Sequence, residues 1–200
     1  INEHPDHYGI YSEREFTYNG ITQPNRNTLL FRDTTIDGMK TGWTTAAGYC
    51  LVASGERDGM RLISVVMGTA SEDARAAESA KLMTYGFRFF ETLKLYDAGQ
   101  VLGNAKVWSG KENAVDIGIT QELYMTIPRG RAADLQASLS LQETITAPIT
   151  QGQVLGTVDI TLDGETLYHG DAMAVQAVER AGLLKRLIDF LTMFFTNLFS

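Results

Sequence analysis

What this sequence lacks excludes several classes of protein. It has a single cysteine, Cys50, so no intrachain disulfide can form and the redox compartment stays open. Its 17 Lys and Arg residues are outnumbered by 24 Asp and Glu, the formal charge is -7, and no basic stripe is present, which argues against a nucleic-acid partner. No apolar run reaches the roughly 20 residues needed to span a bilayer. Because Ile1 replaces a starting Met and no cationic, apolar leader follows, we expect that any export signal has been removed or lies upstream.

The residues that are present suit a soluble globular protein. The chain has 200 residues, of which 44% are hydrophobic and 20% charged, enough for one sizeable core or two small ones. His4 and His7 flank a proline and have no third ligand near them in sequence, so we expect no metal site. We also expect no cofactor.

The first ninety residues show strand patterns followed by a helix pattern. Residues 8–23 read as a hairpin, because Asn19-Gly20 is a dipeptide that accepts positive φ in a tight turn. Ser71 is a plausible N-cap for a helix over 74–93. Further strands are expected at 35–43, 49–54 and 60–67. The face of the helix that packs on the preceding sheet is expected to comprise Leu82, Tyr85, Phe89 and Leu93.

Beyond about residue 90 the pattern changes to short strands and then, at the end, to a helix. Alternation of apolar and polar residues in 135–141 and 158–162 is typical of half-buried strands. The expected strands are 101–108, 114–119, 123–127, 135–141, 154–162 and 166–169. Residues 177–200 then place apolar side chains at helical spacing, with Lys185, Arg186 and Asp189 on the other side. The apolar positions are Leu183, Leu184, Leu187, Ile188, Leu191, Phe194, Phe195 and Leu198, widened by Phe190, Met193 and Phe199.

One short motif carries chemistry. The triplet Lys40-Thr41-Gly42 falls late in the strand predicted over 35–43, ahead of a further pair of strands. A cation and a hydroxyl can bind a carboxylate, while a glycine lets a substrate backbone approach the strand edge. In serine acyltransferases such as penicillin-binding proteins and class A β-lactamases, this triplet lines the active site. Taken alone, however, Lys-Thr-Gly is more often a chance tripeptide on a surface strand.

The residues around the Lys40-Thr41-Gly42 triplet argue against a chance occurrence. In order and spacing, segments along essentially the whole chain resemble the serine-type D-alanyl-D-alanine carboxypeptidases, which are low-molecular-mass penicillin-binding proteins. They are Asn25-Arg26-Asn27, 36–42, Ala47-Gly48-Tyr49, 51–54, 60–68, Glu78-Ser79, 85–92, 126–130, Ala147-Pro148 and Gly152-Gln153-Val154.

The resemblance implies a periplasmic enzyme that removes the terminal D-alanine from peptidoglycan pentapeptide stems and is acylated by β-lactams. A serine would attack the carbonyl between the two D-alanines, and water would hydrolyse the acyl-enzyme. Carried over to this sequence, Lys40 places positive charge beside the serine and the substrate carboxylate, Thr41 hydrogen-bonds that carboxylate, and Gly42 leaves room for the stem peptide. The backbone N–H of Trp43 is an expected oxyanion donor. Arg26 corresponds to an arginine near the carboxylate pocket, although a surface turn residue is an equally good interpretation.

Two positions depart from the family pattern. Trp43 follows the triplet where relatives often carry His or Thr, which alters the rim of the pocket but leaves the backbone donor in place. Cys50 replaces a frequent Asn, and we interpret it as a small buried apolar side chain in preference to a reactive thiol.

The nucleophile is missing. The family's serine lies in Ser-x-x-Lys and its second motif is Ser-x-Asn, and neither pattern occurs in these 200 residues. We therefore expect this polypeptide alone to form no acyl-enzyme, and the first part of the catalytic domain to precede Ile1.

The C-terminal helix has two interpretations, docking on the β domain or attachment to a membrane surface. The family resemblance and the wide, Phe-rich apolar face favour a peripheral anchor on the periplasmic face of the inner membrane.

We expect an α+β fold in three parts: a partial β-lactamase/transpeptidase-like domain over 1–89, a small all-β sandwich-like domain over 90–176, and an amphipathic helix over 177–200. Two alternatives stay open, a β-lactamase of the same superfamily and a membrane-tethered β module that binds partners.

Overall fold

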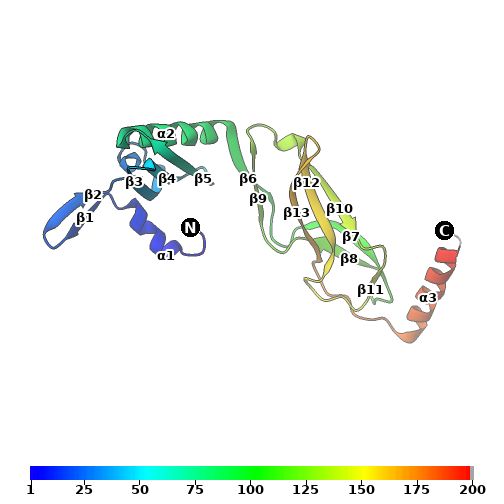
Figure 1. The fold of residues 1–200 in the computed structure, drawn as a ribbon. Helices are drawn as coiled ribbons and strands as arrows, with labels where there is room; N and C mark the ends of the chain where they lie inside the picture. The colour runs from blue at the N-terminus through cyan, green and yellow to red at the C-terminus, as the bar shows by residue number, and fades with distance from the viewer. Residues whose placement is uncertain (199–200) are drawn as a thin grey trace. The chain divides into compact units, whose positions relative to one another are not determined.

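The computed structural model describes residues 1–198 and is rich in sheet, with few helices (Figure 1). The chain divides into two compact units. Unit 1 comprises Ile1–Thr92 with Thr126–Arg129, and unit 2 comprises residues 93–125 with those from 130 onward. The expected α+β character is confirmed.

Unit 1 begins with two helical turns, α1 (Pro5–Tyr8) and η1 (Gly9–Ser12). They are followed by an antiparallel hairpin of β1 (Glu15–Tyr18) and β2 (Ile21–Pro24), which turns at Asn19 (φ 49°) and Gly20 (φ 75°). The predicted turn is confirmed. The prediction that the hairpin starts at residue 8 is wrong, because residues 5–12 form the helical turns instead.

A three-stranded antiparallel sheet forms the centre of unit 1. Its strands are β3 (Ile36–Thr44), β4 (Gly48–Arg57) and β5 (Met60–Thr69), in the order β3-β4-β5. All three predicted strands are confirmed, and β4 joins β5 through a tight turn at Asp58 and Gly59, both at positive φ. A short 3-10 helix, η2 (Thr28–Phe31), precedes the sheet.

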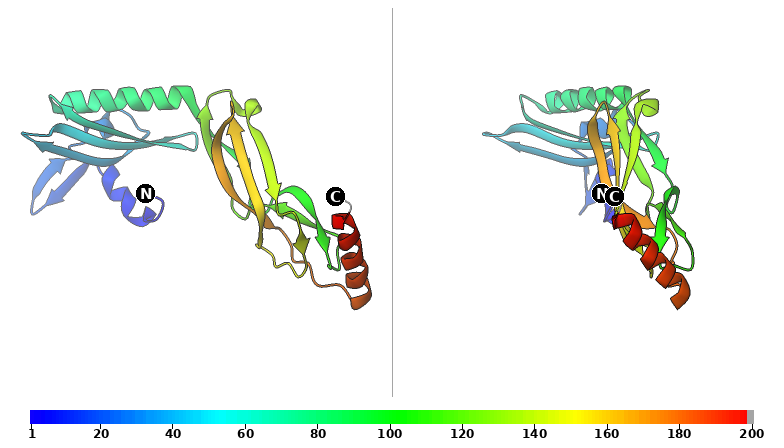
Figure 2. Two further views of the ribbon diagram at one scale, coloured as in Figure 1. Left: turned by 45° about the vertical axis from the view of Figure 1, so that its right-hand side comes forward. Right: turned by 90° about the vertical axis from the view of Figure 1, so that its right-hand side faces the viewer.

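Helix α2 (Glu72–Phe89) covers one face of this sheet (Figure 2). The predicted cap is confirmed, since the Ser71 side chain accepts from the Ala74 N–H at 3.0 Å. The predicted packing face is wrong: Leu82, Tyr85 and Phe89 are 50%, 57% and 49% exposed. The helix instead packs through Arg75, Ala76, Ser79, Met83 and Phe87.

A glycine lies where α2 approaches the sheet. A Cβ at Gly86 would lie 2.4 Å from Cδ1 of Leu62 on β5, so the missing side chain lets the helix approach the sheet closely. The buried face of α2 therefore combines the large residues Met83 and Phe87 with a close approach at Gly86, while Leu82, Tyr85 and Phe89 lie outside it. The helix ends at Phe89 rather than at the predicted residue 93, because Phe90 begins a strand.

A two-stranded ribbon of β6 (Phe90–Tyr96) and β9 (Leu123–Pro128) follows α2. Arg129, directly after β9, donates to the carbonyls of Phe87, Arg88 and Phe90 at 2.9–3.3 Å. These carbonyls lie at the end of the helix, where the last C=O groups have no N–H partner within the helix. Arg129 supplies donors to them and so caps α2.

Six strands of unit 2 form one hydrogen-bonded sheet in the order β10-β12-β13-β8-β7-β11. Their bounds are β7 (Val101–Trp108), β8 (Ala114–Gly118), β10 (Gln136–Leu141), β11 (Ile145–Thr146), β12 (Val154–Leu162) and β13 (Glu165–Ala174), with a 3-10 turn η3 (Ala132–Asp134) before β10. The predicted strands are confirmed, but β13 is longer than predicted and the two-residue β11, parallel to β7, was not predicted.

The core of unit 2 is apolar. Val115 and Ile117 on β8 are 0% exposed, and Leu155 and Ile160 on β12 are 1% exposed. Along β12 the burial skips from Leu155 to Val158, because the strand has a register shift between Val154 and Gly156. Regular alternation then continues through Leu162.

Helix α3 (Leu183–Leu198) closes the described chain. It begins later than the predicted residue 177, because Val178 and Arg180 form β-bridges with Ile149 and Gly110. Phe199 and Ser200, which the sequence also assigns to this helix, lie outside the described residues. Among residues 1–198, no helix has both the length and the apolar character needed to cross a bilayer.

Candidate active site

The Lys-Thr-Gly triplet lies in the second half of β3, as predicted. Lys40 pairs across the sheet with Val52, Thr41 with Leu51, and Gly42 with Cys50. Lys40 and Gly42 are exposed and Thr41 is half-buried. The Lys40 ammonium donates to the Thr41 carbonyl. Among the described strands, β3 pairs only with β4, so its other edge can accept an extended peptide.

The two departures from the family pattern lie on paired strands, Trp43 on β3 and Cys50 on β4. Trp43 is 58% exposed, and its ring lies 5.9 Å from that of Tyr49, its cross-strand partner. Cys50 is half-buried, with Sγ 3.6 Å from the Ala47 carbonyl oxygen. The thiol is therefore less buried than predicted. Both side chains lie near the strand end.

Arg26, the remaining predicted site residue, is exposed in the segment between β2 and η2. The structure brings its backbone to the motif strand through Arg75 of α2. The Arg75 guanidinium donates to the Arg26 carbonyl at 3.2 Å and to the Gly42 carbonyl at 3.3 Å. One cation therefore joins the loop, the strand and the helix.

Sequence reasoning missed Arg75. Its side chain is only 3% exposed and also pairs with Glu72 at 3.3 Å. A buried cation requires several acceptors, and here two of the three are backbone carbonyls of the site. The signal was present in the spacing: Arg75 precedes Ser79 and Met83 by four and eight residues, on the face that α2 buries.

A second buried polar residue fixes the same loop. Asn27 is 2% exposed, and its Nδ2 donates to the Gly38 carbonyl at 2.9 Å while its Oδ1 accepts from the Leu29 N–H at 3.2 Å. The Asn25 side chain in turn accepts from the Asn27 N–H at 2.9 Å. The loop that carries Arg26 is therefore attached to the start of the motif strand.

The resulting surface suits an anionic ligand. Lys40 supplies positive charge beside Gly42 and Thr41 supplies a hydroxyl, whereas Arg75 is buried and its charge is paired with Glu72. An ammonium and a hydroxyl are donors that a carboxylate accepts from. The serines of the sheet, Ser54 and Ser64, are buried and cannot act as exposed nucleophiles. No metal-binding group of three or more His, Cys, Asp or Glu occurs within residues 1–198.

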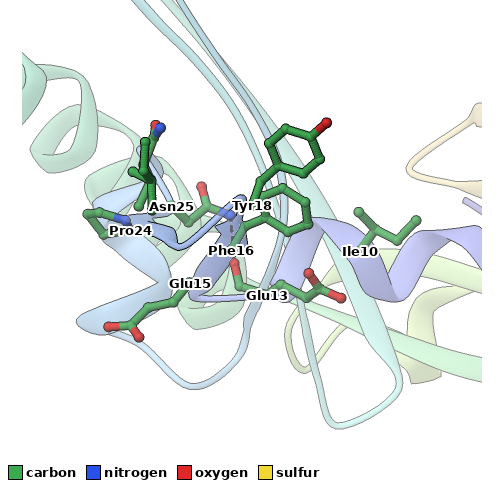
Figure 3. A pocket seen from close by; sticks show the side chains of 9 residues that line it. Ile10, Glu13, Glu15, Phe16, Tyr18, Pro24 and Asn25 are labelled. Carbon is green, nitrogen blue, oxygen red and sulfur yellow. Dashed lines mark hydrogen bonds between the residues drawn. The ribbon is translucent and has the colours of Figure 1, made fainter.

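A hollow of about 440 Å³ lies elsewhere in unit 1, on the β1–β2 hairpin (Figure 3). Its lining includes Ile10, Phe16 and Tyr18 together with Glu13 and Glu15. Because none of the motif residues lines it, this hollow is separate from the site defined by Lys40–Gly42.

Comparisons with known proteins cover both units. Residues 1–71 match the family profile described as D-alanyl-D-alanine carboxypeptidase, and residues 90–180 match that of the penicillin-binding protein 5 C-terminal domain. The chain is 42% identical to D-alanyl-D-alanine carboxypeptidase DacA and 43% identical to DacC, both of Escherichia coli (strain K12), over 100% of this chain and 50% of each relative. Penicillin-binding protein 5 from Haemophilus influenzae matches with a TM-score of 0.82 and 42% identity, over 90% of this chain and 53% of that one. The chain thus spans about half the length of the curated relatives it matches.

Proposed function

Because this chain belongs to the serine-type D-alanyl-D-alanine carboxypeptidase family, we propose that it is part of an enzyme that removes the terminal D-alanine from peptidoglycan pentapeptide stems. The reaction is acyl transfer through an acyl-enzyme, and β-lactams inhibit it by acylating the same serine. The observation that carries the proposal is the exposed Lys40-Thr41-Gly42 edge strand, whose Gly42 carbonyl is held by the buried Arg75.

Each motif residue has a role in this proposal. Lys40 and Thr41 bind the C-terminal carboxylate of the substrate by a charge-assisted and a neutral hydrogen bond. Gly42 lets the stem peptide lie along β3, and the Trp43 N–H donates to the oxyanion of the tetrahedral intermediate. Arg26 adds positive charge at the carboxylate end, and Arg75 positions the strand and the Arg26 loop relative to each other.

We propose that the nucleophile comes from a segment outside these 200 residues, because no Ser-x-x-Lys occurs within them. The catalytic part comprises residues 1–89, followed by the β domain over 90–176 and the terminal segment over 177–200. The test is direct. The longer protein should release D-alanine from a pentapeptide and take a covalent label from a fluorescent penicillin, whereas the 200-residue chain should take none. A labelled serine in the 200-residue chain would contradict the proposal.

A substitution of Lys40 tests whether the motif takes part in acylation. In the longer protein, Lys40→Ala should lower the acylation rate roughly 100-fold or more, since it removes a preorganised charge from the site. Arg186→Ala, in the terminal helix, is the control and should leave the rate unchanged. Equal acylation rates for Lys40→Ala and the unmodified protein would show that Lys40 is not part of the site.

We further propose that α3 attaches the protein to the periplasmic face of the inner membrane. Leu183, Leu184 and Phe190 are 82%, 74% and 62% exposed, so the apolar face is free to enter a bilayer interface. The polar side is held on the β domain, because Asp189 accepts from the Ser109 N–H at 2.8 Å and the Lys185 ammonium donates to the Gly110 carbonyl. Deleting residues 182–200 should release the longer protein from anionic lipid vesicles, and unchanged sedimentation would refute the anchor.

The missing nucleophile motif favours a second candidate for the isolated chain, a membrane-tethered β module that binds partners without catalysis. A β-lactamase of the same superfamily is a third. Assaying the longer protein for D-alanine release against β-lactam hydrolysis separates the three, because the module gives neither product.

A further inference from the structure

The start of the motif strand contains a β-bulge. Ile36 pairs with Gly55 and Gly38 pairs with Ser54, so Asp37 is an extra residue on β3 without a cross-strand partner of its own. Bulges re-aim side chains and often lie beside active sites. Because side chains alternate between faces, the bulge determines which face of the sheet each later residue of β3 occupies.

The side chain of this extra residue is bound from two directions. Arg61 on β5 donates from Nη1 to both carboxylate oxygens of Asp37, at 3.0 and 2.8 Å, and to Ser54 Oγ at 2.8 Å. Tyr8 of α1 donates its hydroxyl to Asp37 Oδ1 at 2.9 Å. Arg61 also pairs with Glu56 at 2.6 Å, so it reaches from the far strand of the sheet across β4 to the bulge on β3.

The backbone next to Asp37 is equally constrained. A Cβ at Gly38 would lie 2.7 Å from the Tyr8 hydroxyl oxygen, so the glycine leaves room for the phenol beside the carboxylate. The Gly38 carbonyl accepts from Asn27. Only Met39 separates Gly38 from Lys40, so a shift of the backbone at the bulge would also shift the motif.

The protonation states favour this arrangement at neutral pH. Burial raises the pKa of the Tyr8 phenol, and the neighbouring Asp37 raises it further, so the phenol stays protonated and donates. Burial alone would lower the pKa of Arg61, but its hydrogen bonds to Asp37 and Glu56 outweigh that effect and the pKa is raised. The ion pair is half-buried, with side-chain exposures of 25% for Arg61 and 31% for Asp37.

We propose that the Asp37–Arg61 ion pair, with Tyr8, pins the bulge of β3 and thereby fixes the register in which the strand presents Lys40 and Thr41 to the substrate. These three are positioning residues, since they act through the motif strand. A slip of one residue would exchange the faces of Lys40 and Thr41, moving the ammonium away from the carboxylate. This inference rests on the proposed carboxypeptidase function.

The test uses the longer protein and measures kcat/KM for D-alanine release together with the acylation rate by a fluorescent penicillin. Asp37→Asn and Arg61→Met should each lower both rates roughly 10- to 100-fold, because small misplacements at a site are costly. The double variant should lose no more than either single variant, since the two residues act as one unit. Arg61→Lys should recover part of the loss, because it keeps the charge but not the planar fork.

Arg32→Met is the matched control. It breaks an Arg–Asp pair of the same kind in the same unit, Arg32 with Asp73 at 2.6 Å, but the pair is exposed and touches no part of β3. Its rates should stay within about twofold of the unmodified protein. Should Arg61→Met fail to fold, Tyr8→Phe decides the question, because it removes only the hydroxyl and should lower both rates about threefold.

Three outcomes overturn the inference: a lowered melting temperature with unchanged kcat/KM, losses that multiply in the double variant, or a Tyr8→Phe protein with unchanged rates. Failure of the proposed function looks different, because the unmodified longer protein would then release no D-alanine and take no penicillin label.

Discussion

The two units bury their apolar residues in different ways. In unit 2 the sheet surrounds a core whose central residues, such as Ile117 and Leu155, are at most 1% exposed. In unit 1 only one face of the sheet is covered by α2, and Ile63, Val65 and Met67 of β5 are 56%, 60% and 71% exposed. Unit 1 also has an apolar core, which includes Leu29, Leu51 and Phe87, and beside it the unit buries the polar side chains of Arg75 and Asn27.

The comparison predicts that core truncation in unit 2 has the largest effect. Ile117→Ala should destabilise unit 2 by about 3 kcal/mol, since it removes buried methylene groups and leaves a cavity. Val65→Ala, on the exposed face of β5, should change the stability of unit 1 by no more than about 0.5 kcal/mol. Hydrogen exchange resolved by residue measures both. Equal losses would mean that the two sheets are packed alike.

Removing a buried polar side chain from unit 1 should come next. Asn27→Ala leaves the Gly38 carbonyl and the Leu29 N–H without their partner and should cost about 2 kcal/mol in chemical denaturation. Asn104→Ala, at an exposed position of β7 in unit 2, is the control and should have an effect near zero. If both variants lose equally little free energy of unfolding, the hydrogen bonds of Asn27 contribute little to the stability of unit 1.

A smaller effect is expected at the start of α2. Ser71→Ala removes the side chain that caps the Ala74 N–H and should cost about 1 kcal/mol. Ser138→Ala on the exposed side of β10 is the matched change in unit 2 and should be neutral. Thermal unfolding measures both variants. Equal melting temperatures for Ser71→Ala and Ser138→Ala would show that the cap does not stabilise α2.

The smallest predicted effect is a pH dependence in unit 1. Burial works to raise the pKa of Asp33, but hydrogen bonds from Thr35 and the nearby Arg57 outweigh it, and the pKa is lowered. A carboxyl whose pKa is lower in the folded state stabilises above its unfolded pKa, about 4, and this stabilisation disappears as the pH falls through the folded value. The side chain is 37% exposed, so the contribution after solvent screening is a few tenths of a kcal/mol.

Asp33→Asn should therefore weaken unit 1 at pH 7 and flatten the acid limb of its stability curve. Denaturant melts between about pH 7 and pH 3 measure the slope. An unchanged slope would show that Asp33 titrates alike in both states.

Local rules were sufficient for much of unit 1. The Asn19-Gly20 turn, the Ser71 cap and the strand that carries Lys40 follow from short-range chemistry, and the structure confirms them. Tertiary packing decided the rest. The buried face of α2 depends on the close approach of Gly86 to Leu62, which no single-helix pattern contains.

Long-range contacts also explain what was missed at the site and in unit 2. Arg75 binds carbonyls 33 and 49 residues away in sequence, so its role follows only from the folded chain. The short strand β11 exists because Ile145 and Thr146 lie beside β7, and α3 starts late because Val178 and Arg180 pair with distant residues.

The most direct test of the account is whether Thr41 binds the substrate's terminal carboxylate. In the longer protein, kcat/KM for release of the last residue should be compared for a peptide ending in D-alanyl-D-alanine and for its C-terminal carboxamide, with the unmodified protein and with Thr41→Val. We predict that the amide costs roughly 100-fold in the unmodified protein and much less in Thr41→Val, because the carboxylate and the hydroxyl act on each other. Equal losses in both proteins would contradict the assignment of the strand as the carboxylate site.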